Sequence, residues 1–582
     1  MATKALKEEI AKYRESSDRE RRINPIVLRS ADERRSNKSD FRVWAAPSTP
    51  SRKSRLGVTV RALAILPSLA YADPRHNGHN DAHLPLEPAR LRHWKSVSAQ
   101  RVLSVSWQTY LSEHNVLEEH FKYTYIVKCC CNGNWHGCEQ CWINSMEILR
   151  ETLLAGFSRT LDLEGFSGDR LATRLSSIAQ IGLTSNGGSC RLGYSVEEKQ
   201  AKNLICQWMA SAGFVIRTDA AGNCFGRIEG TNNSLPSIMC GSHVDTVPDG
   251  GHFDGVLGVL LAVEVVEMWR ATGFVPERSY EVAIFSEEEG SRFNVGFVGS
   301  SAFVGQLPED EFSKLYDHEG RSFASVVEQS GLSIARFHEA RGDLSRIAAF
   351  VEVHIEQGRI LERQMVPVGI VNGICGLVGI EMTVKGLASH AGATPMRYRR
   401  DALVAASHIV AAISKLPSQF SDTAVATVGQ LNVFPNGANV IPGEVRFSID
   451  IRDISAGSLE QLTAKSIDVA TKIAVELDVE LTWKKTLSLM PTPVNAKLRN
   501  WQAKVMREIN LAPFELPSGA GHDAMVLGMH VPMAMFFVRS KDGISHNPLE
   551  FTTLDDCAAA AMVLSRFLKK ILSLTETFDN EA

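Results

Sequence analysis

Residues 240–258, CGSHVDTVPDGGHFDGVLG, are the stretch around which the chain is organised. An apolar run that ends at Cys240 predicts a buried strand, and the apolar pattern over 256–269 predicts a helix. The glycine-rich loop between them carries three polar residues, His243, Asp245 and Asp254. Ligands bind beyond the carboxyl ends of strands in open α/β sheets, and divalent cations accept imidazole and carboxylate ligands together. The stretch therefore predicts a metal site, with a merely polar loop as the alternative.

Length and composition set the broad class. The chain has 582 residues, which predicts two or three domains, and its 44% hydrophobic and 22% charged residues are typical of soluble globular proteins. The formal net charge of -4 gives no reason to expect nucleic acid or acidic lipid as a partner. Apolar runs also stay below the roughly 18 residues that a membrane span needs. We therefore expect a soluble protein with no nucleic-acid or membrane partner, and a cytoplasmic location is favoured.

Residues 1–155 differ from the rest and are expected to form a largely disordered N-terminal extension. The segment 7–55 is polar and rich in Arg, Glu and Ser, without an apolar period. The segment 56–72 resembles a secretory signal but lies far from the N-terminus, so the extension could carry targeting information. The cluster Cys129–Cys141 contains one CxxC pair, whereas zinc sites need two well-spaced pairs. A zinc knuckle, a nucleic-acid module and an irregular extension all stay open.

The remaining chain predicts one α/β domain split by an insert. Residues 156–370 alternate helix and strand patterns, and 488–582 resume that alternation. Residues 371–487 follow the order strand, helix, strand, strand, helix, strand, which is the ferredoxin-like βαββαβ arrangement. We therefore expect a catalytic domain with a central mixed sheet and helices on both faces, interrupted by a ferredoxin-like lid and dimerisation domain.

Further polar residues follow other predicted strands. The strand 279–286 runs into Glu287–Glu289, and three adjacent carboxylates at a strand end indicate either a solvated loop or a nearby cation. The strand 348–357 carries His354 and Glu356 on one face by alternation. Two metal ions commonly share a bridging carboxylate, a role that suits Asp254. Either of the last two glutamates would then bind metal and leave the other as general base. The full candidate set is His243, Asp245, Asp254, Glu288, Glu289, His354 and His546.

Short motifs along the chain resemble those of the zinc/manganese amidohydrolases that act on carbamoyl and ureido groups. They are GSHVDTVPDGGHFDGVLGV, FSEEEGSRF, HIEQGRILE, SHAGATPM, PNGANVIPGEVRFSIDIRD, SGAGHDAM and ISHNPLE. The family includes N-carbamoyl-L-amino-acid hydrolase, allantoate amidohydrolase, ureidoglycolate amidohydrolase and fungal-type β-ureidopropionase, within a superfamily of aminoacylases and dinuclear metallopeptidases. The resemblance covers roughly residues 160–575 and leaves the N-terminal extension out.

The resemblance implies a ligand set for two divalent ions, zinc or manganese, in each subunit. His243 and His354 would bind one ion, Glu289 and His546 would bind the other, and Asp254 would bridge them. It also implies a general base and a residue that orients a ligand: Glu288 would take a proton from water, and Asp245 would hold His243.

The resemblance extends to the substrate and the lid. His390 and His522 would hold the carbonyl oxygen or other polar substrate atoms, and Gln357 would line the ureido pocket. Asn439 and Arg452 would grip a substrate carboxylate, Arg452 as a bidentate fork. Asn439 could instead cap a turn, and Arg452 could pair with Asp450 or Asp453. The lid would close over the site and form a homodimer.

The implied activity is metal-dependent hydrolysis of linear amide C–N bonds, other than peptide bonds, in small carbamoyl or ureido substrates with a carboxylate. N-carbamoyl-L-amino acids come first, and allantoate or ureidoglycolate is the alternative. A dinuclear aminopeptidase or deacylase is a further alternative, although the peptidase branch typically has Asp at the position of His354. An inactive scaffold protein is the alternative outside enzymes.

Overall fold

The computed structural model describes residues 139–306, 312 and 314–578. The expectations for the segment 56–72 and for most of the cysteine cluster fall outside these residues, and Cys141 lies in the first described helix. Among the described helices, none is both long and apolar enough to span a membrane.

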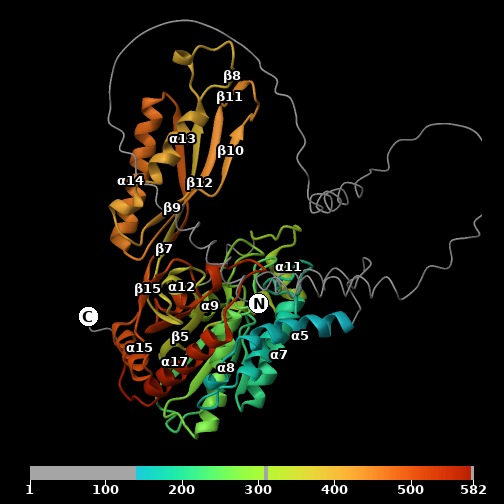
Figure 1. The fold of residues 1–582 in the computed structure, drawn as a ribbon. Coiled ribbons are helices and arrows are strands. Elements are labelled where there is room, and N and C mark those ends of the chain that lie inside the picture. The colour runs from blue at the N-terminus through green and yellow to red at the C-terminus, as the bar shows by residue number, and fades with distance from the viewer. Residues whose placement is uncertain (1–138, 307–311, 313, 579–582) are drawn as a thin grey trace, which may run out of the picture. The chain divides into compact units, whose positions relative to one another are not determined.

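A mixed sheet of nine strands forms the larger domain, in the order β1-β2-β4-β3-β5-β16-β6-β14, with β15 beside β6. Figure 1 labels β5 and β15 of this sheet. Strands β4, β3, β5 and β16 run parallel, so their carboxyl ends meet at one edge. The strands are β1 (Val215–Thr218), β2 (Cys224–Ile228), β3 (Ser237–His243), β4 (Tyr280–Phe285), β5 (Ile347–Ile355), β6 (Val368–Ile374), β14 (Thr492–Pro493), β15 (Glu515–Ser518) and β16 (Met533–Val538).

Helices cover both faces of this sheet, because alternate residues of its strands enter two different hydrophobic clusters. Ile238 and Cys240 of β3 pack into the cluster that includes α8 and α17, and Met239 packs into the one that includes α9 and α16. Strands buried on both faces read as continuous apolar runs, as β16 with its sequence MAMFFV does. The helices of this domain are α5 (Glu139–Ala155), α6 (Gly168–Ala179), α7 (Val196–Ser211), α8 (Val256–Thr272), α9 (Val298–Val304), α11 (Phe323–Gln329), α12 (Ile360–Gln364), α15 (Ala496–Glu508), α16 (Asp523–Leu527) and α17 (Leu554–Leu572). The expected α/β fold with a mixed central sheet and helices is confirmed.

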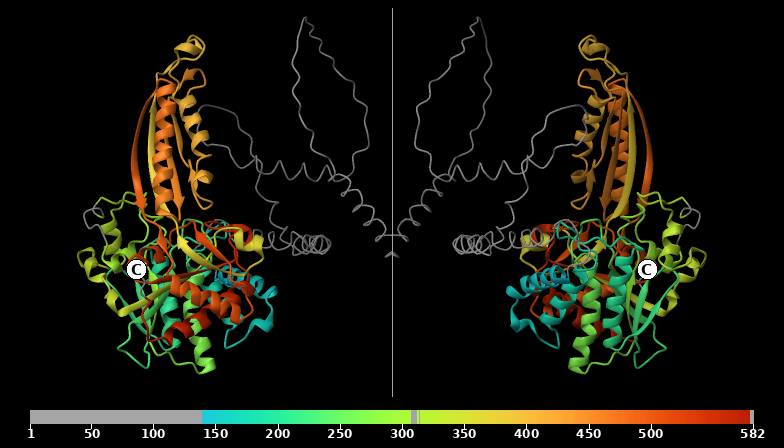
Figure 2. Two further views of the ribbon diagram at one scale, coloured as in Figure 1. Left: turned by 90° about the vertical axis from the view of Figure 1, so that its left-hand side faces the viewer. Right: turned by 90° about the vertical axis from the view of Figure 1, so that its right-hand side faces the viewer.

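The inserted segment forms a second sheet with a core of its own. Strands β10, β12, β7 and β13 lie side by side, with β9 also beside β12, and all pairs are antiparallel. Helices α13 and α14 lie together on one face, where they cover apolar residues of β7 and β12 (Figures 1 and 2). The elements are β7 (Gly376–Lys385), β8 (Ser389–His390), α13 (Ala402–Ile413), β9 (Val425–Thr427), β10 (Leu431–Phe434), β11 (Val440–Ile441), β12 (Glu444–Asp453), α14 (Ala456–Glu476) and β13 (Glu480–Leu489).

Helix α5 lies inside the region that the sequence assigned to the N-terminal extension. Its Leu149 and Leu153 are buried in the same cluster as α6 and α8, and its Arg150 pairs with Asp169 of α6 at 3.0 Å. A helix with a buried face gains its stability from that packing. Residues 139–155 therefore belong structurally with the larger domain.

We expect Leu153→Ala to lower the free energy of unfolding by about 2–5 kcal/mol, because the leucine is only 2% exposed and its loss leaves a cavity. Chemical denaturation of the full chain measures this loss. Glu151→Ala, at an exposed position of the same helix, is the matched control. Equal stability of the two variants would show that α5 does not pack on the domain in solution.

Candidate metal centre and active site

Polar side chains gather where the parallel strands end. His243 ends β3, and the run Glu287–Glu289 follows β4 after one residue. His354 lies at the end of β5, and His546 follows β16 through a short loop. Backbone geometry is unusual here, since Glu287, Gln357 and His546 have positive φ values of 49°, 55° and 54°. Such conformations cost free energy in non-glycine residues and cluster at functional sites.

A first group consists of His243, His354 and Asp254, all buried. The Nε2 atoms of the two histidines lie 3.4 and 3.1 Å from Oδ1 of Asp254. Each Nδ1 lies 3.0 Å from a main-chain carbonyl, of Asp245 and Ile355 respectively. Because a carbonyl only accepts, Nδ1 of each ring carries a proton, and Nε2 is the ring nitrogen left to bind a cation.

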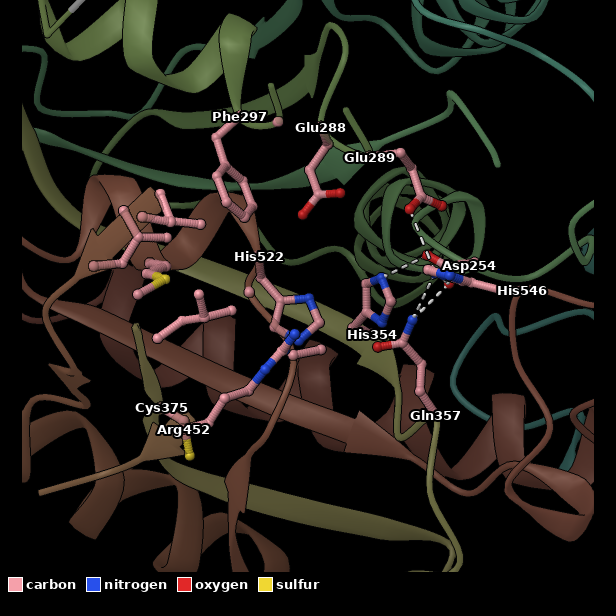
Figure 3. A pocket seen from close by; sticks show the side chains of 17 residues that line it. Asp254, Glu288, Glu289, Phe297, His354, Gln357, Cys375, Arg452, His522 and His546 are labelled. Carbon is pink, nitrogen blue, oxygen red and sulfur yellow. Dashed lines mark hydrogen bonds and ion pairs between the residues drawn. The ribbon is translucent and has the colours of Figure 1, made fainter. Parts of the chain in front are cut away.

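A second group consists of Asp254, Glu289 and His546. His546 Nε2 lies 3.4 Å from Oδ2 of Asp254 and 3.3 Å from Oε2 of Glu289. Asp254 thus faces one group with Oδ1 and the other with Oδ2 (Figure 3). The loop glycines permit this approach, because a Cβ on Gly255 would lie 2.5 Å from Nε2 of His243.

The donor atoms fit a divalent cation. In the described part of the chain, His243 Nε2 and Glu289 Oε1 are buried without a hydrogen-bond partner. Unpaired buried polar atoms are rare in folded proteins and require an explanation. Imidazole and carboxylate together suit zinc or manganese, so a bound ion would satisfy these atoms.

Carboxylates at this site have strongly shifted pKa values. Burial raises the pKa of Glu288 well above its usual value; His243 opposes this, and Asp523 adds to it. Burial also raises the pKa of Glu289, to about 8. Burial would raise the pKa of Asp254 as well, but the adjacent histidines outweigh it and hold that pKa well below its usual value. A cation in the site would favour the charged form of all three carboxylates.

Asp245 contacts His243 differently from the expectation. The hydrogen bond of His243 goes to the main-chain oxygen of Asp245, and the carboxylate Oδ1 lies farther away, at 3.6 Å. The other carboxylate oxygen, Oδ2, accepts the main-chain N–H of Glu289 at 3.1 Å. Asp245 therefore connects the loop of the first group to the loop of the second.

A cavity of about 280 Å³ opens beside the two groups. Glu288, Gln357, Arg452 and His522 all line it (Figure 3). Gln357 donates to Oδ2 of Asp254 at 2.7 Å, so its amide supports a ligand residue. Nε2 of His522 lies 2.9 Å from the hydroxyl of Ser518.

Arg452 forms the ion pair that was open as an alternative. Its Nε and Nη2 donate to the two carboxylate oxygens of Asp450 at 2.8 and 2.9 Å, and its Nη1 donates to Gly519 O at 2.8 Å. Asp453 accepts from serine and threonine hydroxyls instead. An arginine side chain has five N–H donors, so two stay available to a ligand in the cavity.

His390 and Asn439 lie together but do not line this cavity. Val440 pairs with His390 in the β8–β11 ladder, and the Ala391 N–H donates to Asn439 O at 2.9 Å. The ladder follows the far end of β7, whose first residues adjoin the cavity.

Glu550 and Ser545 are supporting residues to which the sequence assigned no role. Glu550 Oε1 accepts the main-chain N–H groups of Phe253 and Asp254 at 2.9 and 3.1 Å. Ser545 Oγ lies 2.8 Å from Glu550 Oε2 and 3.0 Å from Asp254 Oδ2. Glu550 sits four residues after His546, which was the available signal.

We expect Glu550→Ala to weaken metal affinity by about 10- to 100-fold, as losses of residues that orient ligands do. The alanine would leave two buried N–H groups unpaired and release the loop of Asp254. Glu550→Gln keeps an accepting oxygen and should restore most of the affinity. Competition with a chelator measures both, and unchanged affinity in the alanine variant would contradict this role.

An α/β domain that gathers histidine and carboxylate side chains at the ends of its parallel strands is typical of metal-binding enzymes. The chain belongs to Peptidase family M20/M25/M40, and the sequence pattern of that family matches residues 239–570. It is 43% identical over 397 residues to an N-carbamoyl-L-amino acid amidohydrolase of Geobacillus stearothermophilus, covering 68% of this chain and 97% of that protein. It is 35% identical over 395 residues to an allantoate amidohydrolase of Bacillus subtilis, covering 68% and 95%.

A solved structure of the same family superposes on this chain. An amidase of the hydantoinase/carbamoylase family from Burkholderia multivorans superposes with a TM-score of 0.65 at 33% identity, over 70% of this chain and 98% of that one. The family expected from the motifs is therefore confirmed, and the chain is a hydrolase.

Proposed function

We propose that this protein hydrolyses the carbamoyl C–N bond of N-carbamoyl-L-amino acids, using two divalent cations, zinc or manganese. One observation carries the proposal: two ligand groups share Asp254, and Glu288 stands beside them in the same cavity. The similarity to carbamoyl amino acid amidohydrolases supports the substrate class.

Bound cations, Glu288 and a water molecule take part in the proposed hydrolysis. Bound cations would polarise the ureido carbonyl and lower the pKa of a water molecule towards about 7. Glu288 takes the proton from the attacking water and returns it to the departing amino-acid nitrogen. Water adds its oxygen to the ureido carbon, the bond to that nitrogen breaks, and the carbamate released decomposes to ammonia and carbon dioxide.

His522 holds the substrate through one ring nitrogen. Ser518 donates its only hydroxyl proton to Ala520 O at 2.8 Å, so Nε2 of His522 is the donor in their 2.9 Å contact. Burial and the neighbouring His354 lower the pKa of His522 well below its usual value, which keeps the ring neutral. Its Nδ1 is then an acceptor that suits an N–H of the ureido group.

Arg452 binds the substrate carboxylate. Asp450 holds the edge of the guanidinium formed by Nε and Nη2, Gly519 O holds Nη1, and the two unused N–H donors are available to a carboxylate in the cavity. Arg452 is the only Lys or Arg among the described residues that line the cavity, which makes it the counter-charge for an anionic substrate.

The inserted domain acts as a ferredoxin-like lid and as the interface of a homodimer. His390 and Asn439 lie beyond the far end of β7, whose 10 residues span about 30 Å. For His390 and Asn439 to reach the cavity of their own chain, the inserted domain would have to move by about the length of β7. A second copy that presents its own His390 and Asn439 is the simpler way to complete the site. The assembly state in solution tests this part.

Allantoate or ureidoglycolate is the alternative substrate, supported by the 35% identity to an allantoate amidohydrolase. Both present a ureido group and a carboxylate, so the same ligand and anchor residues would hold them.

Ammonia release by purified, manganese-loaded protein tests the proposal. N-carbamoyl-L-amino acids should release ammonia, and a chelator should stop it. Release from allantoate alone would move the protein to ureide breakdown with the same residues in the same roles. No release from either class, together with hydrolysis of peptides, would overturn the proposed function.

A further inference from the structure

We propose that the cavity selects N-carbamoyl amino acids with an apolar side chain, because one wall of it is apolar. We call this surface the apolar wall. It consists of Phe297, Cys375, Leu377, Leu487, Leu489 and Met525. The inference rests on the proposed function and narrows its substrate class.

The cavity has two chemically different sides. Asp254, His546 and Glu289 lie at one side in Figure 3, and Phe297 and Cys375 lie at the other, with His522 between them. A substrate that places its ureido carbon beside Glu288 and the ligand groups must direct the rest of its atoms towards the apolar wall.

The apolar wall adjoins the carboxylate anchor on the same sheet. Leu377 of β7 is the direct partner of Arg452 on β12 and of Leu489 on β13. Directly paired residues on neighbouring strands place their side chains on the same face, about 5 Å apart. An amino acid carries its carboxylate and its side chain on one carbon atom. A carboxylate on Arg452 therefore places that side chain against Leu377 and its neighbours.

A polar substituent would have no side-chain partner there. Among the described residues that line the cavity, the polar side chains are the ligand groups, Glu288, Gln357, Arg452 and His522. Gln357 donates to Asp254 and lies on the side of the ligand groups in Figure 3, and the free Nδ1 of His522 is taken by the ureido group of the substrate. Burying an amide without a hydrogen bond is unfavourable, so the second ureido group of allantoate is disfavoured at the apolar wall.

N-carbamoyl-L-leucine and N-carbamoyl-L-asparagine form the decisive pair, since their side chains have nearly the same shape and differ in polarity. We expect kcat/KM for the leucine substrate to exceed that for the asparagine substrate by about tenfold or more. Allantoate and ureidoglycolate in parallel wells should be poorer than the leucine substrate.

Variants of the apolar wall test the cause of this preference. Leu377→Asn should reduce the leucine-to-asparagine ratio of kcat/KM several-fold. Leu487→Asn should reduce this ratio as well, and the position is 45% exposed and therefore tolerates a polar residue. This second variant tests the inference if Leu377→Asn does not fold. Val475→Asn on α14, where the valine is 76% exposed and outside the cavity, should keep the wild-type ratio.

The outcomes separate this inference from the proposed function. A ratio near one, a ratio unchanged in both wall variants, or a preference for allantoate would overturn the selection of apolar side chains while ureido hydrolysis stands. Silence with every ureido substrate would remove the proposed function, and the inference with it.

Discussion

Replacing Glu288 with glutamine is expected to lower kcat by about 100- to 10,000-fold while the bound metal is retained. Glu288 is only 7% exposed, lines the cavity, and lies 3.7 Å from Nε2 of His243 without belonging to either ligand group. Glutamine has the same shape but cannot accept the proton of the attacking water. Steady-state ammonia release and the metal content per chain measure the two halves of this prediction.

The neighbouring glutamates are matched controls. The Glu287 carboxylate does not line the cavity and accepts the main-chain N–H of Arg292 at 3.2 Å, and burial raises its pKa well above the usual value. A neutral glutamine should therefore replace Glu287 with little effect on kcat. Glu289→Gln should lower metal content instead. Full activity of Glu288→Gln, or equal loss in Glu287→Gln, would contradict the assignment of the general base.

Strand and helix positions could be predicted because long apolar patterns determine them. The expected strand 348–357 corresponds to β5, and the apolar helix after the first loop corresponds to α8. The sequence missed α5 as part of the larger domain because its two buried leucines stand next to an unusual cysteine cluster, and a short apolar period does not show what it packs against.

Candidate site residues could be predicted where a polar residue follows an apolar strand, because strand ends of a parallel sheet converge. Which atom of a residue makes a contact depends on local geometry that no pattern contains. The bond from His243 to the main-chain oxygen of Asp245, rather than to its carboxylate, is one example. Arg452 is another example. Alternation along the strand places Asp450 on the same face as Arg452, but the sequence left Asp453 open as a partner, and the folded chain shows the pair with Asp450.

The metal roles of the five ligand residues stay predictions, and Asp254 offers the sharpest test of them. Asp254 belongs to both groups and faces each with a different oxygen, so its replacement acts on both ions at once. We expect Asp254→Asn to bind neither ion tightly and to lose about three orders of magnitude or more in kcat/KM, since metal ions supply several kcal/mol of transition-state stabilisation.

A single-group variant gives this prediction its contrast. His546 belongs only to the second group, and its side chain is 49% exposed, so His546→Ala should fold normally and lose about one ion per chain. Elemental analysis after dialysis counts the ions directly. If Asp254→Asn lost only one ion, as His546→Ala should, the larger loss expected for a residue that belongs to both groups would be absent and the prediction would fail. A loss of both ions in Asp254→Asn and of one in His546→Ala is the result expected of a carboxylate shared by the two groups.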